Sequence, residues 1–269
     1  MKNIELLSKL CSVAGAPGHE KRIRDFIIGE IKKEGLSYTI DNLGNLIVKI
    51  KGKIEKSVMV AAHMDEIGFI VKHIDKKGFV FFHPLGGFDP KTLTSQRVTI
   101  HGTQDVLGVM GSKPIHIMSA EDRKKTPKIE DYFIDTGLKK EDVEKKISVG
   151  DPITRYSELI ELGQNINGKS LDNRASVFVL LQVLKKINQP PYDVYGVFTV
   201  QEEVGLRGAS AASLLINPDF GFGLDTTIAF DTPGSAKKDQ VSQLGNGPCI
   251  KIMDSQTICD YRMVNYMKD

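Results

Sequence analysis

The sequence has no tryptophan, and phenylalanine and tyrosine together make up only 7% of its 269 residues. Proteins that bind sugars or single-stranded nucleic acids usually stack the rings of the ligand on aromatic side chains. The composition therefore lowers the expectation of a carbohydrate-binding or single-strand-binding protein, without excluding either class.

A surplus of charge is also absent, because 36 lysines and arginines are balanced by 34 aspartates and glutamates. A nucleic-acid-binding protein usually needs a clustered basic surplus, so we expect no nucleic-acid partner. No apolar run approaches the roughly 20 residues that span a bilayer. The apolar stretch at the N-terminus is interrupted by Glu5, Ser8 and Lys9, which argues against a signal peptide. We therefore expect no membrane partner.

Cysteine is scarce, and Cys11, Cys249 and Cys259 are odd in number and lack Cys-x-x-Cys spacing. This usage is typical of a reducing compartment, so the sequence predicts a cytoplasmic protein. The 41% hydrophobic and 26% charged residues are close to the averages of soluble globular proteins. The length is sufficient for one large or two ordinary domains.

Helical and extended patterns alternate in the first part and the last third of the chain. The expected helices cover residues 4–11, 23–31, 175–184 and 209–215, and the expected buried strands cover residues 58–62 and 194–200. Alternation of this kind predicts an α/β layered fold.

The segment between these two parts has a different texture. From about Gly68 to Arg155, short β-rich pieces are separated by Gly, Pro and charged turns, which predicts a small barrel or sandwich. Residues 119–147 are dense in Lys, Asp and Glu, as is typical of a solvated surface loop and helix. The middle segment is therefore interpreted as an insertion into the α/β domain.

Imidazole and carboxylate side chains stand at the ends of several predicted elements. The candidates are His63 after the strand 58–62, Glu202 and Glu203 after the strand 194–200, Asp225 after the run 220–224, and Asp172 before a helix. Ligands of open α/β sheets bind beyond the carboxyl ends of the strands, so we expect these side chains to meet at one edge. A set of imidazole and carboxylates suits zinc, cobalt or manganese.

Each candidate has a simpler structural explanation when it is taken alone. His63 could be a hydrogen-bonded structural histidine, Asp172 an N-cap, and Asp225 the start of a turn. The pair Glu202 and Glu203 could be surface charge. Together these explanations weaken, because all of them would have to fall at the same edge of the sheet.

The spacing within the motifs suggests how a metal site would work. Asp65, two residues after His63, could accept a hydrogen bond from the far imidazole nitrogen. Adjacent side chains on an extended segment point in opposite directions, so one of Glu202 and Glu203 could bind a metal while the other reaches a metal-bound water. Two metals bridged by a carboxylate would polarise a carbonyl and bring the pKa of the water towards about 7.

As a set, the motifs resemble the TET-type, glutamyl-aminopeptidase family of dinuclear metallo-aminopeptidases, some members of which are labelled endoglucanase M-like. The resemblance runs in order along essentially the whole chain. It is carried by the segments 62–68 (AHMDEIG), 171–174 (LDNR), 200–209 (VQEEVGLRGA) and 224–227 (LDTT).

The resemblance implies two divalent metal ions, zinc or cobalt, and a position for each ligand. His63 and Asp225 would hold the first metal, Asp172 would bridge the two, and Glu203 would hold the second.

Two further roles and a function follow from the same resemblance. Glu202 would be the general base that takes a proton from the bridging water and hands it to the leaving amine, and Asp65 would orient His63. The implied function is a metal-dependent aminopeptidase that removes N-terminal residues from small peptides.

The implied fold is a three-layer α/β/α catalytic domain with an inserted domain. Residues 1–67 and 163–269 would form the catalytic domain, and residues 68–162 a small, PDZ-like β-barrel that mediates dimerisation. Members assemble as dimers and often as tetrahedral dodecamers that enclose their active sites, so a homo-oligomer is expected.

One part of the family pattern has no counterpart here. Family members supply a further metal-ligand histidine and a glycine-rich Thr-Asp-Ala segment from a region beyond Asp269, whereas the last histidine of this chain is His116. After a strand-like run over 248–253 and a helix-like segment, the sequence ends. The resemblance therefore predicts a catalytic domain that is incomplete at its C-terminus, with a weakened second metal site.

Two other functions remain open at this point. A glycoside hydrolase could use two carboxylates, although the absence of tryptophan and the histidine among the carboxylates favour a metal. A truncated, inactive homologue could act only as an assembly partner through its inserted domain. The sequence does not determine the native metal or the preferred N-terminal residue.

Overall fold

The structure is a computed structural model that describes residues 3–269 of the chain. Two units can be distinguished, which divide after Thr226. The first unit holds a five-stranded sheet and a barrel, and the second begins at Thr227.

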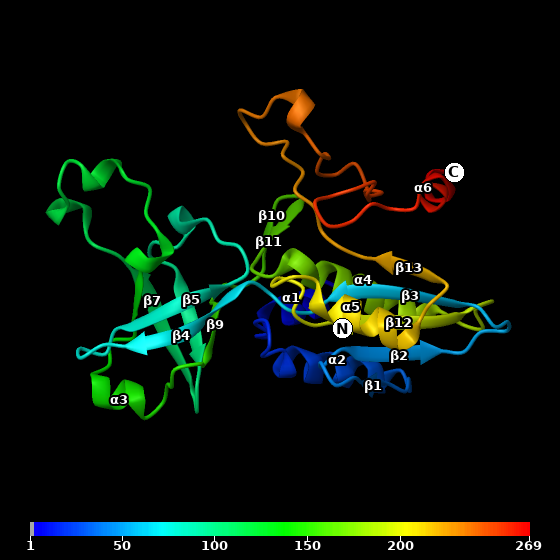
Figure 1. The fold of residues 1–269 in the computed structure, drawn as a ribbon, viewed down its shortest axis with the longest axis horizontal. Coiled ribbons are helices and arrows are strands. Elements are labelled where there is room, and N and C mark those ends of the chain that lie inside the picture. Colours follow the sequence, from blue (N-terminus) through cyan, green and yellow to red (C-terminus); the bar gives the residue numbers. More distant parts are fainter. Residues whose placement is uncertain (1–2) are drawn as a thin grey trace. The chain divides into compact units, whose positions relative to one another are not determined.

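The five-stranded sheet is mixed, with the strand order β1-β2-β12-β3-β13 (Figure 1). Strand β3 pairs in parallel with β12 and β13, whereas β2 pairs with β12 in the antiparallel sense. The bounds of these strands are β1 (Thr39–Ile40), β2 (Leu46–Ile50), β3 (Ser57–His63), β12 (Asp193–Thr199) and β13 (Phe220–Gly223). The register places Thr199 opposite His63, so β3 and β12 end together.

Helices cover both faces of this sheet, because its strands carry apolar residues on both sides. On one face, Leu46, Val48 and Phe198 pack with residues of α1, α2 and α4. On the other face, Ile47 and Val197 pack with Ala212 of α5. The helices are α1 (Asn3–Ser12), α2 (Lys21–Lys33), α4 (Leu171–Lys186) and α5 (Arg207–Ile216). The predicted α/β fold is confirmed.

The middle of the chain forms a closed barrel with the strand order β4-β5-β8-β7-β6-β9. Its strands are β4 (Gly68–Ile74), β5 (Val80–Leu85), β6 (Arg97–His101), β7 (Asp105–Gly111), β8 (Phe133–Asp135) and β9 (Pro152–Arg155). A separate core fills it, with Phe69, Ile100 and Ile134 almost fully buried. Of the two predicted alternatives, the barrel is therefore the one observed.

One part of the charged run 119–147 was interpreted wrongly as surface loop and helix alone. Within it, β8 pairs with both β5 and β7, and its central residue Ile134 is fully buried. A three-residue strand with one inward apolar side chain is too short to show an alternating pattern. The expected helix is present as α3 (Lys140–Glu144).

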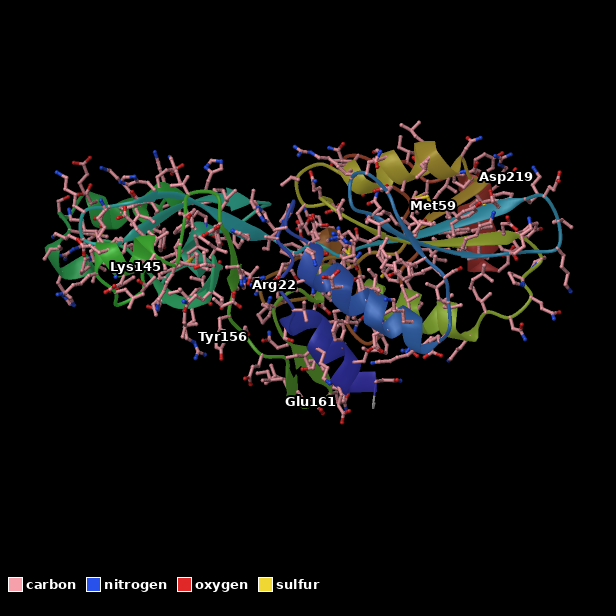
Figure 2. All side chains as sticks on the ribbon, turned by 90° about the horizontal axis from the view of Figure 1, so that it is seen from below. Arg22, Met59, Lys145, Tyr156, Glu161 and Asp219 are labelled. Carbon is pink, nitrogen blue, oxygen red and sulfur yellow. The ribbon has the colours of Figure 1, made fainter. Side chains whose placement is uncertain are left out.

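The remaining elements of the first unit are short. A hairpin of β10 (Ile160–Leu162) and β11 (Asn165–Asn167) follows the barrel. Four 3-10 turns are η1 (Pro90–Thr92), η2 (Ile115–Ile117), η3 (Asp122–Lys124) and η4 (Ile129–Asp131). Arg22 of α2, labelled in Figure 2, forms an ion pair of 2.7 Å with Asp105 of the barrel strand β7.

The second unit contains η5 (Lys237–Asp239) and α6 (Tyr261–Lys268). The expected strand over 248–253 is not formed, because only Met253 pairs, in an isolated bridge with Ile258. Proline and cysteine within that run are followed by a turn at 254–257 rather than by a pairing strand. Within residues 3–269, no helix combines the length and apolar character needed to cross a membrane.

Candidate metal centre

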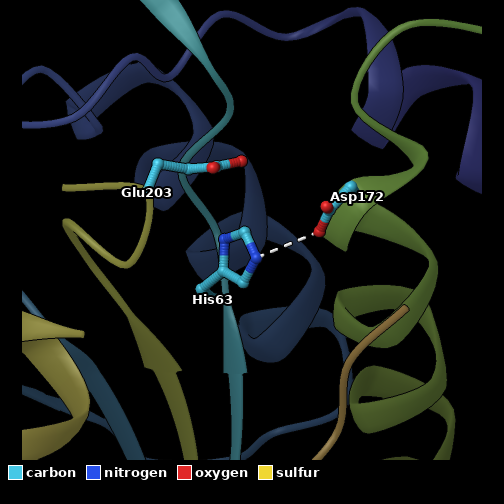
Figure 3. A group of neighbouring side chains, drawn as sticks. All are labelled: His63, Asp172 and Glu203. Carbon is cyan, nitrogen blue, oxygen red and sulfur yellow. Dashed lines mark hydrogen bonds and ion pairs between the residues drawn. The ribbon is translucent and has the colours of Figure 1, made fainter. Parts of the chain in front are cut away.

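His63 is the last residue of β3 and forms the centre of the site. Its side chain is buried, and its Nε2 atom lies 3.2 Å from Asp172 Oδ1 (Figure 3). The same nitrogen lies 3.8 Å from Glu202 Oε2 and 3.8 Å from Asp225 Oδ1. One imidazole nitrogen therefore faces carboxylates from three different segments of the chain.

Asp65 supports this arrangement from the buried side. Its side chain is fully buried, and its Oδ1 atom lies 3.4 Å from Nδ1 of His63, longer than an ordinary hydrogen bond. Its two oxygens also accept hydrogen bonds from the backbone N–H groups of Glu202 and Glu203, each 3.1 Å long. The contact with His63 was expected from the spacing, whereas the two backbone bonds were not.

Glu202 and Glu203 lie in a turn after β12 rather than on the extended segment that the sequence suggested. The backbone N–H groups of Gly205 and Leu206 both donate to the Glu202 carbonyl, and Gln201 has a positive φ of 53°. Buried Asn45 fixes the loop, since its side chain accepts from Val200 N and donates to the Gly208 carbonyl. No local pattern in the sequence indicates this role, because Val200 and Gly208 are more than 150 residues from Asn45.

Asp172 lies at the start of α4, where its backbone is not helical (φ −79°, ψ 106°), and its side chain does not cap the helix. Ser170 occupies the N-cap position, and the Asp172 carboxylate contacts His63 instead, so the N-cap explanation is wrong. The next side chain, Asn173, donates from Nδ2 to the Leu224 carbonyl at 2.8 Å. This bond ties the start of α4 to the residue before Asp225.

These side chains form two groups of metal donors that share His63. His63, Asp172 and Glu203 offer ligand atoms within 4.8 Å of one another, and so do His63, Glu202 and Asp225. Two ligand atoms about 2.1 Å from one tetrahedral ion are separated by about 3.4 Å. The distances of 3.2 to 3.8 Å around His63 Nε2 match that separation, so the residues fit a divalent ion.

The charge of the site is strongly negative. Within residues 3–269, none of Asp65, Asp172, Glu202 and Glu203 forms an ion pair with a lysine or arginine. Burial raises the pKa of Glu203 to about 7, and the neighbouring carboxylates add to this effect. Burial likewise raises the pKa of Glu202. The site therefore favours the binding of positive charge.

His63 holds a proton for the same reason. Burial by itself lowers the pKa of His63, but the hydrogen bond to Asp172 and the nearby charge of Asp65 outweigh burial and raise that pKa to about 10. Hydrogen bonding from His63 in turn lowers the pKa of Asp172. Metal ligands must be deprotonated, so a bound cation would replace the protons held by His63 and Glu203.

A second cluster of charges lies directly beside this site. Lys169 Nζ donates to both oxygens of Glu66 at 2.8 Å, Ser170 Oγ donates to Oε2 of Glu66, and Gly15 N donates to Oε1. Arg174 is fully buried and donates from Nη1 to the carbonyls of Leu10 and Val13. The sequence showed Glu66 and Arg174 only as members of motifs, without a reason to pair them.

The structure thus brings all six candidates together, namely His63, Asp65, Asp172, Glu202, Glu203 and Asp225.

Comparison with known proteins gives a consistent result. A sequence profile described as M42 glutamyl aminopeptidase matches residues 44–269. Putative aminopeptidase FrvX of Escherichia coli (strain K12) is 35% identical, over 99% of this chain and 76% of its own length.

Two further relatives extend the comparison. Lysyl aminopeptidase of Pyrococcus furiosus is 32% identical, over 94% of this chain and 74% of its own length. The solved structure of the TET1 peptidase of Pyrococcus horikoshii, which can assemble into a tetrahedron or a large octahedral shell, is also similar. It superimposes with a TM-score of 0.88 at 30% identity, over 99% of this chain and 80% of that chain.

Proposed function

The chain belongs to the M42 glutamyl aminopeptidase family and is an aminopeptidase, and we propose that the carboxylate cluster around His63 carries its activity. The family resemblance inferred from the motifs is confirmed by this membership. The observation that carries the proposal is the position of His63 Nε2, within 3.2 to 3.8 Å of three carboxylates from separate segments.

Two divalent ions, zinc or cobalt, would complete the proposed site. His63 and Asp225 would hold the first ion, Glu203 would hold the second, and Asp172 would be a ligand of both. When bound, such ions supply Lewis acidity that polarises the scissile carbonyl and lowers the pKa of water. The carboxylates gathered around His63, with their surplus of negative charge, support a cationic ligand.

Glu202 is the proposed general base of the reaction. Burial raises its pKa, which brings the carboxylate closer to the neutral range where a group both accepts and returns a proton efficiently. Glu202 accepts a proton from the attacking water and then donates it to the amine of the broken peptide bond. The Asp65 carboxylate holds the backbone N–H of Glu202 and so keeps the base in place.

The substrates proposed are small peptides with a free N-terminus. A protonated α-amino group is attracted to a cluster in which the carboxylates outnumber the one imidazole. A glycoside hydrolase is less well supported, because the carboxylates converge on an imidazole, which such an enzyme does not need. An inactive assembly partner has no support from the site, since all six candidates lie together.

The barrel gives a basis for a proposal about assembly. Residues 68–162 would form an inserted, PDZ-like dimerisation domain between the two catalytic segments, 1–67 and 163–269. The closed barrel with its own core supports an independent domain. The TET1 peptidase can assemble into a tetrahedron or a large octahedral shell, and we extend a homo-oligomeric state to this chain.

The experiment that tests the site is hydrolysis of aminoacyl p-nitroanilides with added zinc or cobalt. Glu202→Gln should lower kcat by about 10²- to 10⁴-fold, while the variant still binds the metal. The matched control is Glu161→Gln, on exposed Glu161 of β10, which is labelled in Figure 2 and should leave activity unchanged. Turnover by Glu202→Gln equal to that of the parent would exclude Glu202 as the base.

A further inference from the structure

A cavity of about 340 Å³ lies beside two of the proposed metal ligands. Asp172 and Glu203 form part of its lining, and so do the apolar side chains of Ile67 and Leu171. Among residues 3–269, Arg155 is the only cationic side chain in the lining. The cavity therefore combines an acidic part, which belongs to the proposed catalytic site, with one guanidinium that the proposed mechanism does not use.

Arg155 is the last residue of β9, where the chain leaves the barrel just before Tyr156, labelled in Figure 2. Its backbone pairs with Val98 of β6, which fixes the start of the side chain. The side chain is half-buried, and its Nε atom is buried without a hydrogen-bond partner. Among residues 3–269, the Arg155 guanidinium forms no hydrogen bond or ion pair.

The neighbouring cation is in a different situation. Lys169 is buried, but both oxygens of Glu66 accept hydrogen bonds from it. Arginine stays protonated in proteins, so Arg155 cannot avoid its charge by losing a proton. Burying part of a charge without a partner is unfavourable, and an anion that enters the cavity would remove this cost.

We propose that Arg155 binds a carboxylate group of the substrate, which makes this cavity a specificity subsite of the aminopeptidase. The inference rests on the proposed function, because it places the free amine of the peptide near the acidic part of the cavity. A planar guanidinium pairs with a carboxylate through two parallel hydrogen bonds. The apolar walls at Ile67 and Leu171 suit the methylene groups that join the amine to such a carboxylate.

Two carboxylates of a peptide can supply this chemistry. One is the side chain of an N-terminal aspartate or glutamate, and the other is the C-terminal carboxylate of a dipeptide. Glutamyl and glutaminyl p-nitroanilides have side chains of nearly the same shape and differ in the side-chain carboxylate. The dipeptide Leu-Gly and its C-terminal amide differ only in the second.

The test compares Arg155→Ala with the parent on these four substrates. We expect kcat/KM to fall by about 10- to 100-fold on the substrate that carries the recognised carboxylate, since charge-assisted hydrogen bonds are lost. On the matched substrate without it, the change should stay within about threefold. Equal losses on both members of each pair, or no loss on any substrate, would overturn the proposal.

Further variants separate recognition from a general effect on the fold. Arg97→Ala is the matched control, because Arg97 lies on barrel strand β6, packs over the Tyr156 ring and is not part of the cavity lining. Arg155→Lys keeps the charge and should retain part of the preference. Arg155→Glu should favour lysyl over glutamyl p-nitroanilide, and an unchanged ratio would contradict the proposal.

A binding measurement keeps this inference separate from the proposed function. If no substrate is hydrolysed, the proposed function fails, but calorimetry still compares the binding of free glutamate, leucine and Leu-Gly to the parent and to Arg155→Ala. Weaker binding of glutamate or Leu-Gly to the variant, with leucine unchanged, supports the subsite. Equal binding of all three ligands to both proteins overturns it.

Discussion

Asp65 and Glu66 are adjacent in the sequence, yet they belong to two clusters of ionisable side chains that are organised in opposite ways. The closed cluster consists of Glu66, Lys169, Ser170 and Arg174, all 6% exposed or less. The Glu66 carboxylate accepts hydrogen bonds from the Lys169 ammonium, the Ser170 hydroxyl and the backbone N–H of Gly15. Folding alone therefore supplies the partners of Glu66.

The open cluster consists of His63, Asp65, Asp172, Glu202, Glu203 and Asp225. Its carboxylates converge on one imidazole, and Asp172 is exposed while Glu203 is half-buried. The chain brings no lysine or arginine to Glu202 or Glu203 within residues 3–269. The contrast with the closed cluster indicates that the balancing charge of the open cluster comes from a ligand.

The largest effect is expected from breaking the closed cluster. Glu66→Ala leaves the charges of Lys169 and Arg174 buried without their carboxylate, and removal of one partner of a buried pair typically costs about 3–5 kcal/mol. Urea denaturation should show this loss in the free energy of unfolding. The double variant Glu66→Gln with Lys169→Met should recover part of it, and a Glu66→Ala variant as stable as the parent would contradict the closed cluster.

A smaller effect is expected when the support of the open cluster is weakened. Asp65→Asn keeps the size of the side chain but removes the charge that faces His63 and the two backbone N–H groups of Glu202 and Glu203. Loss of such a supporting contact typically lowers metal affinity by about 10- to 100-fold. Competition with a chromogenic chelator measures the affinity, and an unchanged value would show that Asp65 does not act on the site.

The two clusters should also differ in their response to pH, because protons occupy the open cluster when metal is absent. The pKa of Glu203 is about 7 in the folded protein, whereas it is 4.5 in the unfolded chain. Its contribution to stability is full below pH 4.5 and is lost as the pH rises to about 7. His63 acts in the same direction between 6.5 and about 10.

The melting temperature of the metal-free protein should therefore fall as the pH rises, because Glu203 and His63 lose their protons. The affinity for metal should increase over the same range. Melting curves with chelator between pH 5 and 7 test this for the parent and for Glu203→Gln. The variant should show a shallower decline. Identical slopes in the two proteins would mean that Glu203 does not hold the proton.

The smallest effect on the free energy of unfolding is expected at an exposed ion pair between a basic and an acidic side chain. Arg22 and Asp105 form a 2.7 Å ion pair, but their side chains are 50% and 46% exposed. Exposed pairs typically contribute about 0–1 kcal/mol, so Arg22→Ala should change the free energy of unfolding by no more than that. A loss as large as that of Glu66→Ala would remove the distinction between buried and exposed pairs.

The open cluster could be predicted from the sequence because most of its residues stand at or after the ends of strands, while Asp172 stands at the start of a helix. The apolar strand before His63 and the one before Glu202 marked the edge of the sheet where ligands bind. The alternation of helices and strands and the β-rich middle segment could also be predicted, because the spacing of apolar residues indicates which side of an element is buried.

The closed cluster could not be predicted in this way. Glu66 and Lys169 are 103 residues apart, and Leu10 and Arg174 are 164 residues apart. Nothing in the local pattern around Lys169 shows that its charge is buried rather than solvated. The same applies to Asn45, which bonds Gly208 across 163 residues, and to β8, whose single inward residue Ile134 lies in a charged run.

The most direct test of the account is metal binding to chelator-treated protein, measured by calorimetry with cobalt. The parent should bind the ion, and His63→Ala should bind less of it, because His63 is a proposed ligand of the first ion. His73→Ala, on an exposed histidine of β4, is the matched control and should bind as the parent does. Equal binding by His63→Ala and the parent, or no binding by the parent, would contradict the account.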